Sequence, residues 1–328
     1  MEEANTNIQP PEKEHKKIKV IHIFVFLIVL SFAFNIFLFL KLNSLNGISG
    51  AYFHLVKPLE KVPIDSNVQD GKSILHYNGL KVLIEEEIKE YNSTGNVGVF
   101  VQDAKTGAWM GVNEKLGFWP ASLLKVPVMM AILKKVDRGE ITLKDKVTLI
   151  QEDLDSFYGD LYKKGAGVQL TIEELLKKMI VTSDNTAKNA LKRQLSLEEL
   201  DTVFKHVGIP DPYLETNGQI VSPRDYMRLF KALYYSTFLS PDLSELALDL
   251  TTDTQQENLI SKGVPPEIQV AHKFGNFETG LLHDCGIVYH QKNPYYICVM
   301  TIDLELEQSA GLIRKISTDV YKFVESSS

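Results

Sequence analysis

The sequence contains little cysteine and no excess of positive charge. Its 328 residues include two cysteines, and the formal net charge is -7 with a pI near 5.7. The two cysteines form no C-x-x-C pair, so neither a redox-active pair nor a zinc ribbon is indicated. The acidic balance provides no basic stripe to neutralise phosphates, which argues against a nucleic-acid partner.

Other cofactor signatures are also missing. His272, His283 and His290 match no metal-ligand spacing, and "GAGVQL" lacks the third glycine of a dinucleotide fingerprint. No internal repeat of solenoid length is present. We therefore expect no metal and no nucleotide cofactor. The length fits one or two domains with a sizeable core, and we expect a monomer.

One long apolar run stands near the N-terminus. Val20–Leu40 is interrupted only by His22, Ser31 and Asn35. At about 1.5 Å per residue, its length matches the roughly 30 Å hydrocarbon core of a membrane. Lysines are concentrated before the run, with a single one after it (Lys13, Lys16, Lys17, Lys19 and then Lys41). We expect a retained single-pass anchor; a cleaved signal peptide and a buried helix are the alternatives.

The lysine bias also predicts the orientation. It places the N-terminus in the cytoplasm and everything after Lys41 outside the membrane. Residues 1–19 are then a cytoplasmic tail, and residues 41–73, which mix Gly, Pro and charges without a period, are a stalk. Residues 74–328 form the extracytoplasmic domain.

The expected elements of that domain favour an α+β architecture. Capping boxes at Thr171 and Ser196, and Ser222 followed by Pro223, open three helices. Strands at both ends of the domain, with helices between them, predict one sheet, antiparallel because its late connections are short. Helices are expected at 80–91, 172–181, from 197 to near Gly208, from 223, and at 308–324; strands are expected at 97–103, 109–112, 268–274, 284–290 and 295–303.

"WPASLLKVPVMM" places a serine and a lysine three residues apart. If a helix starts near Ala121, Ser122 and Lys125 share one face, with Ser122 at the positive end of the helix. A lysine in apolar surroundings has a lowered pKa and can accept a proton from a neighbouring serine. The alternative is a capping serine with a snorkelling lysine. Pro127 fits that alternative badly, because a proline inside a helix removes a hydrogen-bond donor.

Two further segments carry polar groups suited to chemistry. Ser183-Asp184-Asn185 falls between two helices, where Ser183 can relay a proton and Asn185 can bind a carbonyl. An ordinary helix N-cap is the alternative. Lys273 lies near the end of an expected strand and is followed by Gly275; a strand-end lysine and a turn glycine are the alternatives.

Order and spacing make the three segments specific together. S-x-x-K, then S-D-N 61 residues after the serine, then K-x-G about 90 further on, is the signature set of class A β-lactamases and penicillin-binding proteins. The sequence resembles that family across about residues 74–325. The resemblance implies an antiparallel sheet flanked by helices, together with an all-helical subdomain.

The resemblance also implies roles for the motif residues. Ser122 would attack an amide or β-lactam carbonyl, with Lys125 as its base or assisting the base. Ser183 would pass a proton to the leaving nitrogen, and Asn185 would hold the side-chain amide of the substrate. Lys273, with Gly275, would bind near the substrate carboxylate.

The implied oxyanion hole is made of backbone groups. It would consist of the N–H groups of Ser122 and Asn276, the latter matched by its offset after Lys273. Losing one such donor typically costs about 3 kcal/mol of transition-state stabilisation.

Two departures from the family pattern concern the substrate carboxylate. The third motif reads Lys273-Phe274-Gly275, so an aromatic ring replaces the hydroxyl that normally helps to bind the carboxylate. The offset at which family members often carry an arginine holds Leu282, with His283 next.

A third departure concerns deacylation. Class A β-lactamases activate the hydrolytic water with a glutamate on a long loop. Here the matching segment is short, Glu215 is its one glutamate, and the match puts Tyr213 where the base would stand. Glu215 is a candidate base or, alternatively, a solvated loop carboxylate, and in the second case the acyl-enzyme would hydrolyse slowly.

The two cysteines are spaced to face each other across a hairpin. Cys285 and Cys298 are equidistant from the expected turn. We expect two buried thiols, with an extracytoplasmic disulfide as the alternative.

These observations predict a membrane-anchored, extracytoplasmic serine hydrolase that acts on β-lactams through an acyl-enzyme at Ser122. The alternatives are a D,D-peptidase acting on peptidoglycan stem peptides, and a sensor domain that binds muropeptides or β-lactams without turnover.

Overall fold

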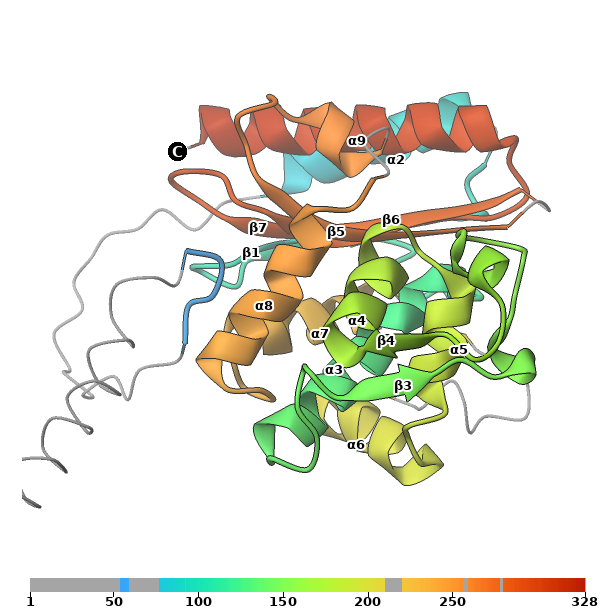
Figure 1. Ribbon diagram of the computed structural model, residues 1–328. Coiled ribbons are helices and arrows are strands. Elements are labelled where there is room, and N and C mark those ends of the chain that lie inside the picture. Colours follow the sequence, from blue (N-terminus) through green and yellow to red (C-terminus); the bar gives the residue numbers. More distant parts are fainter. Residues whose placement is uncertain are drawn as a thin grey trace, which may run out of the picture. The chain divides into compact units, whose positions relative to one another are not determined.

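A computed structural model describes residues 54–58, 77–91, 93–209, 220–255, 259–277 and 280–327 (Figure 1). All of them belong to one compact unit, His54–Ser328. Within these ranges no helix is long and apolar enough to cross a membrane. The run Val20–Leu40 and the tail before it lie outside the described residues, so the anchor and its orientation stay predictions.

A five-stranded antiparallel sheet forms the centre of the domain, with strand order β2-β1-β7-β6-β5. The first two strands come from the start of the domain and the last three from its end, which confirms that one sheet is built from both. The hairpin between β5 and β6 pairs as far as Phe277 and Leu281, so β6 begins earlier than predicted. The strands are β1 (Val97–Asp103), β2 (Trp109–Val112), β5 (Val270–Phe277), β6 (Leu281–Val288) and β7 (Tyr295–Thr301).

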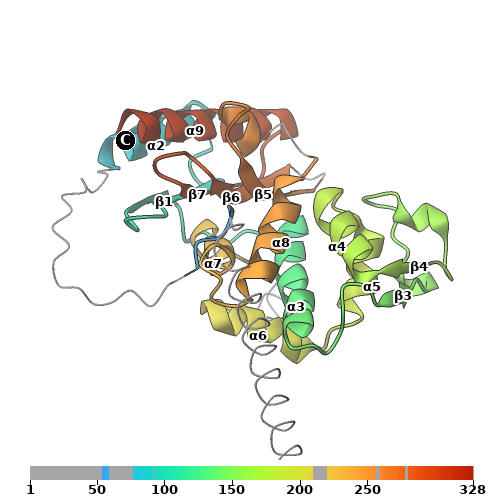
Figure 2. The ribbon, with the colours of Figure 1, turned by 60° about the vertical axis from the view of Figure 1, so that its left-hand side comes forward.

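Helices cover both faces of this sheet (Figures 1 and 2). α2 (Asn78–Glu90) and α9 (Leu306–Ser326) lie on one face, and α7 (Pro223–Tyr234) and α8 (Pro241–Thr252) on the other. Every residue of β6 and β7 is buried as a result. Strands covered on both sides read as continuous apolar runs rather than as an alternating pattern.

A second layer lies beyond α7 and α8. It contains α3 (Lys125–Asp137), α4 (Ile172–Val181), α5 (Asn185–Lys192) and α6 (Leu197–Val207). The expectation of an all-helical subdomain was wrong, because β3 (Lys146–Thr148) pairs with β4 (Gln169–Thr171) in a two-stranded ribbon. Each of these strands buries a single side chain, which is too short a pattern to be recognised in a sequence.

The predicted helix starts are confirmed at atomic detail. Thr171 and Ser196 each accept a hydrogen bond from the backbone N–H of the glutamate three residues later, and that glutamate bonds back to the cap. Ser222 caps α7 with Pro223 at the first position. These contacts satisfy N–H groups that the helix itself leaves unpaired.

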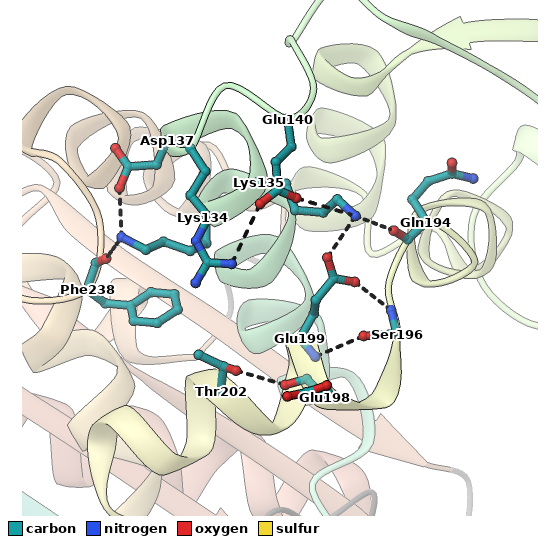
Figure 3. Close-up of polar contacts among 11 residues, drawn as sticks. Lys134, Lys135, Asp137, Glu140, Gln194, Ser196, Glu198, Glu199, Thr202 and Phe238 are labelled. Carbon is teal, nitrogen blue, oxygen red and sulfur yellow. Dashed lines mark hydrogen bonds and ion pairs between the residues drawn. The ribbon is translucent and has the colours of Figure 1, made fainter.

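Paired lysines join the C-terminal end of α3 to its neighbours (Figure 3). The amine of Lys134 lies 2.8 Å from a carboxylate oxygen of Asp137 and donates to the carbonyl of Phe238. Lys135 lies 2.8 Å from the carboxylate of Glu199, in the first turn of α6. The far end of α3 is therefore held in place, while its N-terminal end carries the candidate site.

Residues 54–58, within the segment predicted as the stalk, bind to the domain. The backbone N–H groups of His54, Leu55 and Val56 donate to the carboxylate of Glu245 on α8 at 2.9–3.1 Å. The hydroxyl of Tyr289 donates to the carbonyl of Leu55, whose side chain is fully buried.

The expectation of two buried thiols was wrong. Cys285 on β6 and Cys298 on β7 are direct partners in the antiparallel register and form a disulfide. The strand register places the two sulfur atoms next to each other across β6 and β7. The sequence spacing was compatible with this pairing but did not establish it.

A buried histidine–aspartate pair joins β5 and β6 beside the disulfide. The Nδ1 atom of His272 lies 2.8 Å from Asp284, and Asp284 also accepts the backbone N–H of Ile260. Both side chains of the pair are buried. Removing one partner of a buried pair leaves polar groups without compensation.

Asp284→Ala is expected to lower the free energy of unfolding by about 3–5 kcal/mol, because it orphans the buried His272 ring and the Ile260 N–H. Urea unfolding followed by circular dichroism measures this change. The control Asp249→Ala, at an exposed position on α8, should cost at most about 0.5 kcal/mol. Equal effects of the two substitutions would contradict a structural role for the buried pair.

Candidate active site

The segment that carries Ser122 and Lys125 is two helices rather than one. Ala121–Leu124 is a 3-10 turn, and α3 begins only at Lys125. Pro127 therefore lies in the first turn of α3, where its missing N–H would have no intrahelical partner. The prediction of a helix from Ala121 with an interior proline is corrected on this point.

The amine of Lys125 lies at the centre of the assembled motifs. Its Nζ atom is 2.9 Å from Ser122 Oγ, 3.0 Å from Ser183 Oγ and 2.8 Å from Asn185 Oδ1. It also lies 2.5 Å from the carbonyl oxygen of Ser183. The Lys125 side chain is 1% exposed. Residues from two of the three motifs thus converge on one buried nitrogen.

The partners of this amine indicate how a neutral lysine would be oriented. The Ser183 carbonyl and Asn185 Oδ1 can only accept, so they use the two N–H bonds of a neutral amine. The Nδ2 atom of Asn185 faces Asp155 at 3.3 Å, which is consistent with its oxygen facing Lys125. The remaining lone pair is then available to the hydroxyl of Ser122.

Burial and positive neighbours favour that neutral state. Burial, and secondarily the charges of Lys273 and Lys188, lower the pKa of Lys125 to about 6, against the opposing effect of Asp184 and Asp155. A lysine with a pKa near neutrality can serve as a proton acceptor in water of ordinary pH.

Ser183 bridges two amines. Its hydroxyl oxygen lies 3.0 Å from Lys125 Nζ and 3.2 Å from Lys273 Nζ. Burial also lowers the pKa of the fully buried Lys273, to about 7, with Asp284 opposing. The hydroxyl can therefore exchange protons with either amine.

The aspartate between Ser183 and Asn185 is structural. Asp184 accepts the N–H groups of Ala187, Asp160 and Leu161 at 2.8–2.9 Å. Gly159 lies so close that an added Cβ would be 2.1 Å from an oxygen of Asp184, and its φ is +92°. The buried carboxylate thus fixes a wall of the site to α5.

β5 approaches the serine along its backbone. A Cβ added at Gly275 would lie 2.9 Å from the carbonyl of Pro120 and 3.2 Å from the backbone nitrogen of Ser122. Glycine is required here because any side chain would fill the space beside that N–H group. Asn276 follows and lines the same cleft as Ser122.

The residues that depart from the family pattern are buried. Phe274 is 3% exposed, and its ring packs near Tyr158 and beneath the amine of Lys273. Leu282 is buried in β6. Neither side chain offers a polar group to a carboxylate.

His283, next to Leu282, holds the segment before the serine. Its Nδ1 accepts the N–H of Thr301, so Nε2 carries the hydrogen and donates to the carbonyl of Trp119 at 2.9 Å. Burial lowers the pKa of His283 to about 4, although its backbone hydrogen bonds oppose this. The ring is therefore a neutral tether rather than a carboxylate-binding cation.

A cleft of about 330 Å³ opens over Ser122 and Lys125. The motif spacing did not predict most of the residues that line this cleft. Only Lys188 and Lys192 could have been inferred from the sequence, because they follow Asn185 at helical intervals and so share its face of α5. The other residues come from segments without a motif. Those not predicted are Trp119, Ala121, Leu124, Asp155, Phe157, Tyr158, Lys188, Asn189, Lys192 and Phe277.

Two strained backbone positions flank the site. Ala121 and Ser183 have φ values of 48° and 54°, which are uncommon for residues other than glycine. Each costs about 1–3 kcal/mol and is kept only where surrounding contacts enforce it. The predicted deacylation candidate, Glu215, lies outside the described residues, as does Tyr213, which the match puts where the base would stand.

Comparison with known proteins identifies relatives of this arrangement. The model of the family described as "Beta-lactamase enzyme family" matches residues 80–324. A β-lactamase of Streptomyces albus G is 25% identical over 238 residues, which are 66% of this chain and 75% of that protein. A D-alanyl-D-alanine carboxypeptidase, DacF of Bacillus subtilis (strain 168), is 33% identical over 93 residues, 28% of this chain and 23% of that protein.

A solved structure extends the likeness to three dimensions. A mutant of PBP-A, described as an acyl-enzyme complex with penicillin G, superposes with a TM-score of 0.68. It is 27% identical, and the match covers 76% of this chain and 97% of that one. The buried serine–lysine centre and the family match over residues 80–324 lead to one conclusion: the chain belongs to the β-lactamase enzyme family and is a class A β-lactamase-like serine hydrolase.

Proposed function

We propose that Ser122 is the nucleophile and Lys125 its proton acceptor. The observation that carries this proposal is the 2.9 Å contact between a buried lysine of lowered pKa and the serine hydroxyl. As Ser122 Oγ forms a bond to the substrate carbonyl carbon, its proton moves to Lys125 Nζ. The backbone N–H groups of Ser122 and Asn276 receive the developing oxyanion.

Ser183 completes the acylation. When the carbon–nitrogen bond breaks, the Ser183 hydroxyl donates its hydrogen to the leaving nitrogen and regains one from Lys125, which lies 3.0 Å away; Lys273, 3.2 Å from the same oxygen, keeps its charge. The proton taken from Ser122 thereby ends on the leaving group. Asn185 holds the side-chain amide, and Lys273 with Gly275 binds near the carboxylate.

The substrate that this proposal favours is a β-lactam amide. A water molecule then attacks the acyl carbon, breaks its bond to Ser122 and returns a proton to the serine. We assign Glu215 as a candidate base for this step. The predicted anchor and lysine bias support a single-pass membrane protein whose hydrolase domain lies outside the cytoplasm.

A D,D-peptidase acting on peptidoglycan stem peptides is the second candidate. The partial match to a D-alanyl-D-alanine carboxypeptidase supports this candidate. Phe274, whose ring is buried, replaces a carboxylate-binding hydroxyl that β-lactamases and penicillin-binding proteins share, so it departs from both patterns equally. In both candidates the first covalent step is the same, so deacylation distinguishes them.

An aromatic rim supports a preference for apolar acyl side chains. Phe157 and Phe277 stack with ring centroids 5.6 Å apart, and Trp119 packs edge-on against Phe277 at 5.3 Å. All three rings are partly exposed, at 56%, 37% and 43%, and line the cleft. An aromatic acyl group entering there would exchange water for ring contacts.

Ser122→Ala should abolish both turnover of a chromogenic cephalosporin and covalent labelling by a fluorescent penicillin, because the attacking oxygen is removed. The test uses the full-length chain in non-ionic detergent. Fast turnover by the wild type supports the β-lactamase, and stable labelling with cleavage of a D-Ala-D-Ala peptide supports the peptidase. Stable labelling without either activity indicates a sensor. Labelling that survives in Ser122→Ala rules the proposed nucleophile out.

The pH profile of acylation should be bell-shaped, with limbs near pH 6 and pH 7. Lys125 must be neutral, so the rate rises with pH through its pKa; Lys273 must be charged, so the rate falls through its own. Stopped-flow labelling measures kcat/KM across pH 4–9. Since the Lys188 charge lowers the Lys125 pKa, Lys188→Gln should move the acid limb to higher pH. A limb that moves to lower pH would refute this electrostatic coupling.

Removing the two stacked rings should reduce the preference for aromatic acyl groups. In Phe157→Ala/Phe277→Ala, the ratio of kcat/KM for a phenylacetyl penicillin to that for the penam nucleus without an acyl group should fall roughly tenfold. The control Phe157→Tyr/Phe277→Tyr keeps both rings and should retain the ratio. An unchanged ratio in the alanine variant would show that the rim does not select substrates.

A further inference from the structure

One lysine outside the catalytic site has a lowered pKa, as three lysines of that site do. Four described lysines have a lowered pKa, and three of them, Lys125, Lys188 and Lys273, belong to the site. The fourth is Lys231 on α7, where burial and the charges of Arg228 and Arg224 lower the pKa. Half-buried cations that face like charges cluster at functional sites more than elsewhere.

Lys231 belongs to a row of cations on one face of α7. Arg224, Arg228 and Lys231 follow each other at intervals of four and three residues, spanning about 10 Å along the helix. The carboxylate of Asp225 lies 3.3 Å from Arg228. In the part of the chain that the structure describes, neither Arg224 nor Lys231 forms an ion pair.

Other half-buried lysines of this protein are compensated. At the end of α3, Lys134 and Lys135 each lie 2.8 Å from a carboxylate and also bond to a backbone carbonyl (Figure 3). In the row on α7, Arg228 is compensated in the same way: it lies 3.3 Å from Asp225 and donates to the carbonyl of Gly208 at 2.7 Å. Among the described residues Arg224 and Lys231 have no carboxylate partner, so their charges are available to an anion from outside.

The cations line two adjoining hollows. One, of about 140 Å³, lies between α7 and the sheet edge and is lined by Phe100, Gln102, Trp109, Arg224, Arg228 and Lys231. The other, of about 210 Å³, reaches the end of α6 and shares Arg228 and Lys231. We call the two hollows together the α7 groove.

The position and spacing of these cations destabilise α7. Arg224 lies in the first turn of α7, at the positive end of the helix, where a cation is disfavoured. Like charges at helical spacing also destabilise a helix. Trp109, 45% exposed on the edge strand β2, holds the guanidinium of Arg224 at 4.7 Å from its ring centroid. An orienting contact at a destabilising position points to a ligand.

We propose that the α7 groove binds a flexible chain of inorganic phosphate groups, that is, a polyphosphate. Arginine forks match phosphate oxygens, and the ammonium adds a point charge. Cations shared between two hollows fit an anion with more than one phosphate. Because the charges are half-buried in hollows, the groove suits discrete groups rather than a flat membrane surface.

Calorimetric titration of the full-length chain with inorganic tripolyphosphate tests this proposal. Binding should weaken at least tenfold in Arg224→Gln/Lys231→Gln and less than twofold in Lys89→Gln/Lys322→Gln. The control removes two exposed charges from α2 and α9, on the other face of the sheet. Raising the salt concentration should weaken wild-type binding more steeply than that of the groove variant.

Comparison ligands distinguish the alternatives. Citrate should bind at least tenfold more weakly than tripolyphosphate, and vesicles of anionic phospholipid should not show a dependence on Arg224 and Lys231. The proposal would be overturned if the two double variants lost affinity for tripolyphosphate equally, or if citrate bound as tightly as tripolyphosphate. Binding that depends on the groove but occurs only with vesicles would also overturn it. Labelling by fluorescent penicillin, which should be unchanged in both variants, confirms folding and keeps this test separate from that of Ser122.

Discussion

The site depends on holding one lysine amine in the protein interior, where no carboxylate of the described residues lies within hydrogen-bonding distance. Lys125 is 1% exposed, and its contacts in the described part of the chain are hydroxyl, carbonyl and amide oxygens. A charged ammonium is poorly solvated there, so the neutral form is favoured. Most other features of the centre position those oxygens.

Backbone geometry provides this positioning. The 3-10 turn at Ala121–Leu124 turns Ser122 toward Lys125 before α3 begins, and Ser183 adopts a left-handed conformation that brings both its carbonyl and its hydroxyl to the amine. Asp184 holds the opposite wall through three backbone N–H groups. Gly275 allows β5 to approach the serine, and the neutral ring of His283 ties the preceding segment to β6.

The elements with strong local signals were predictable. Thr171, Ser196 and Ser222 indicate their helices because capping is a local interaction, and the strands at both ends of the domain indicated one antiparallel sheet. The β3–β4 ribbon was missed because each strand buries one side chain. The boundary between the 3-10 turn and α3 was missed because Pro127 was interpreted as interior to a helix.

The motif residues of the site were also predictable, but its walls were not. Ser122, Lys125, Ser183 and Asn185 meet as their order implied, whereas Phe157, Phe277 and Trp119 converge from three segments that share no sequence pattern. Which loop reaches which rim is decided by tertiary packing. The disulfide between Cys285 and Cys298 likewise follows from strand register rather than from composition.

The ionisation state of Lys125 can be measured directly in the full-length protein. Carbon-13 labelling at lysine Cε allows each amine to be titrated by NMR, with the signal of Lys125 identified by its loss in Lys125→Arg. The account predicts a signal that titrates at about pH 6. A Lys125 signal that titrates near the ordinary lysine value of about 10.4 would contradict it, because the amine would then be charged and unable to accept the proton of Ser122.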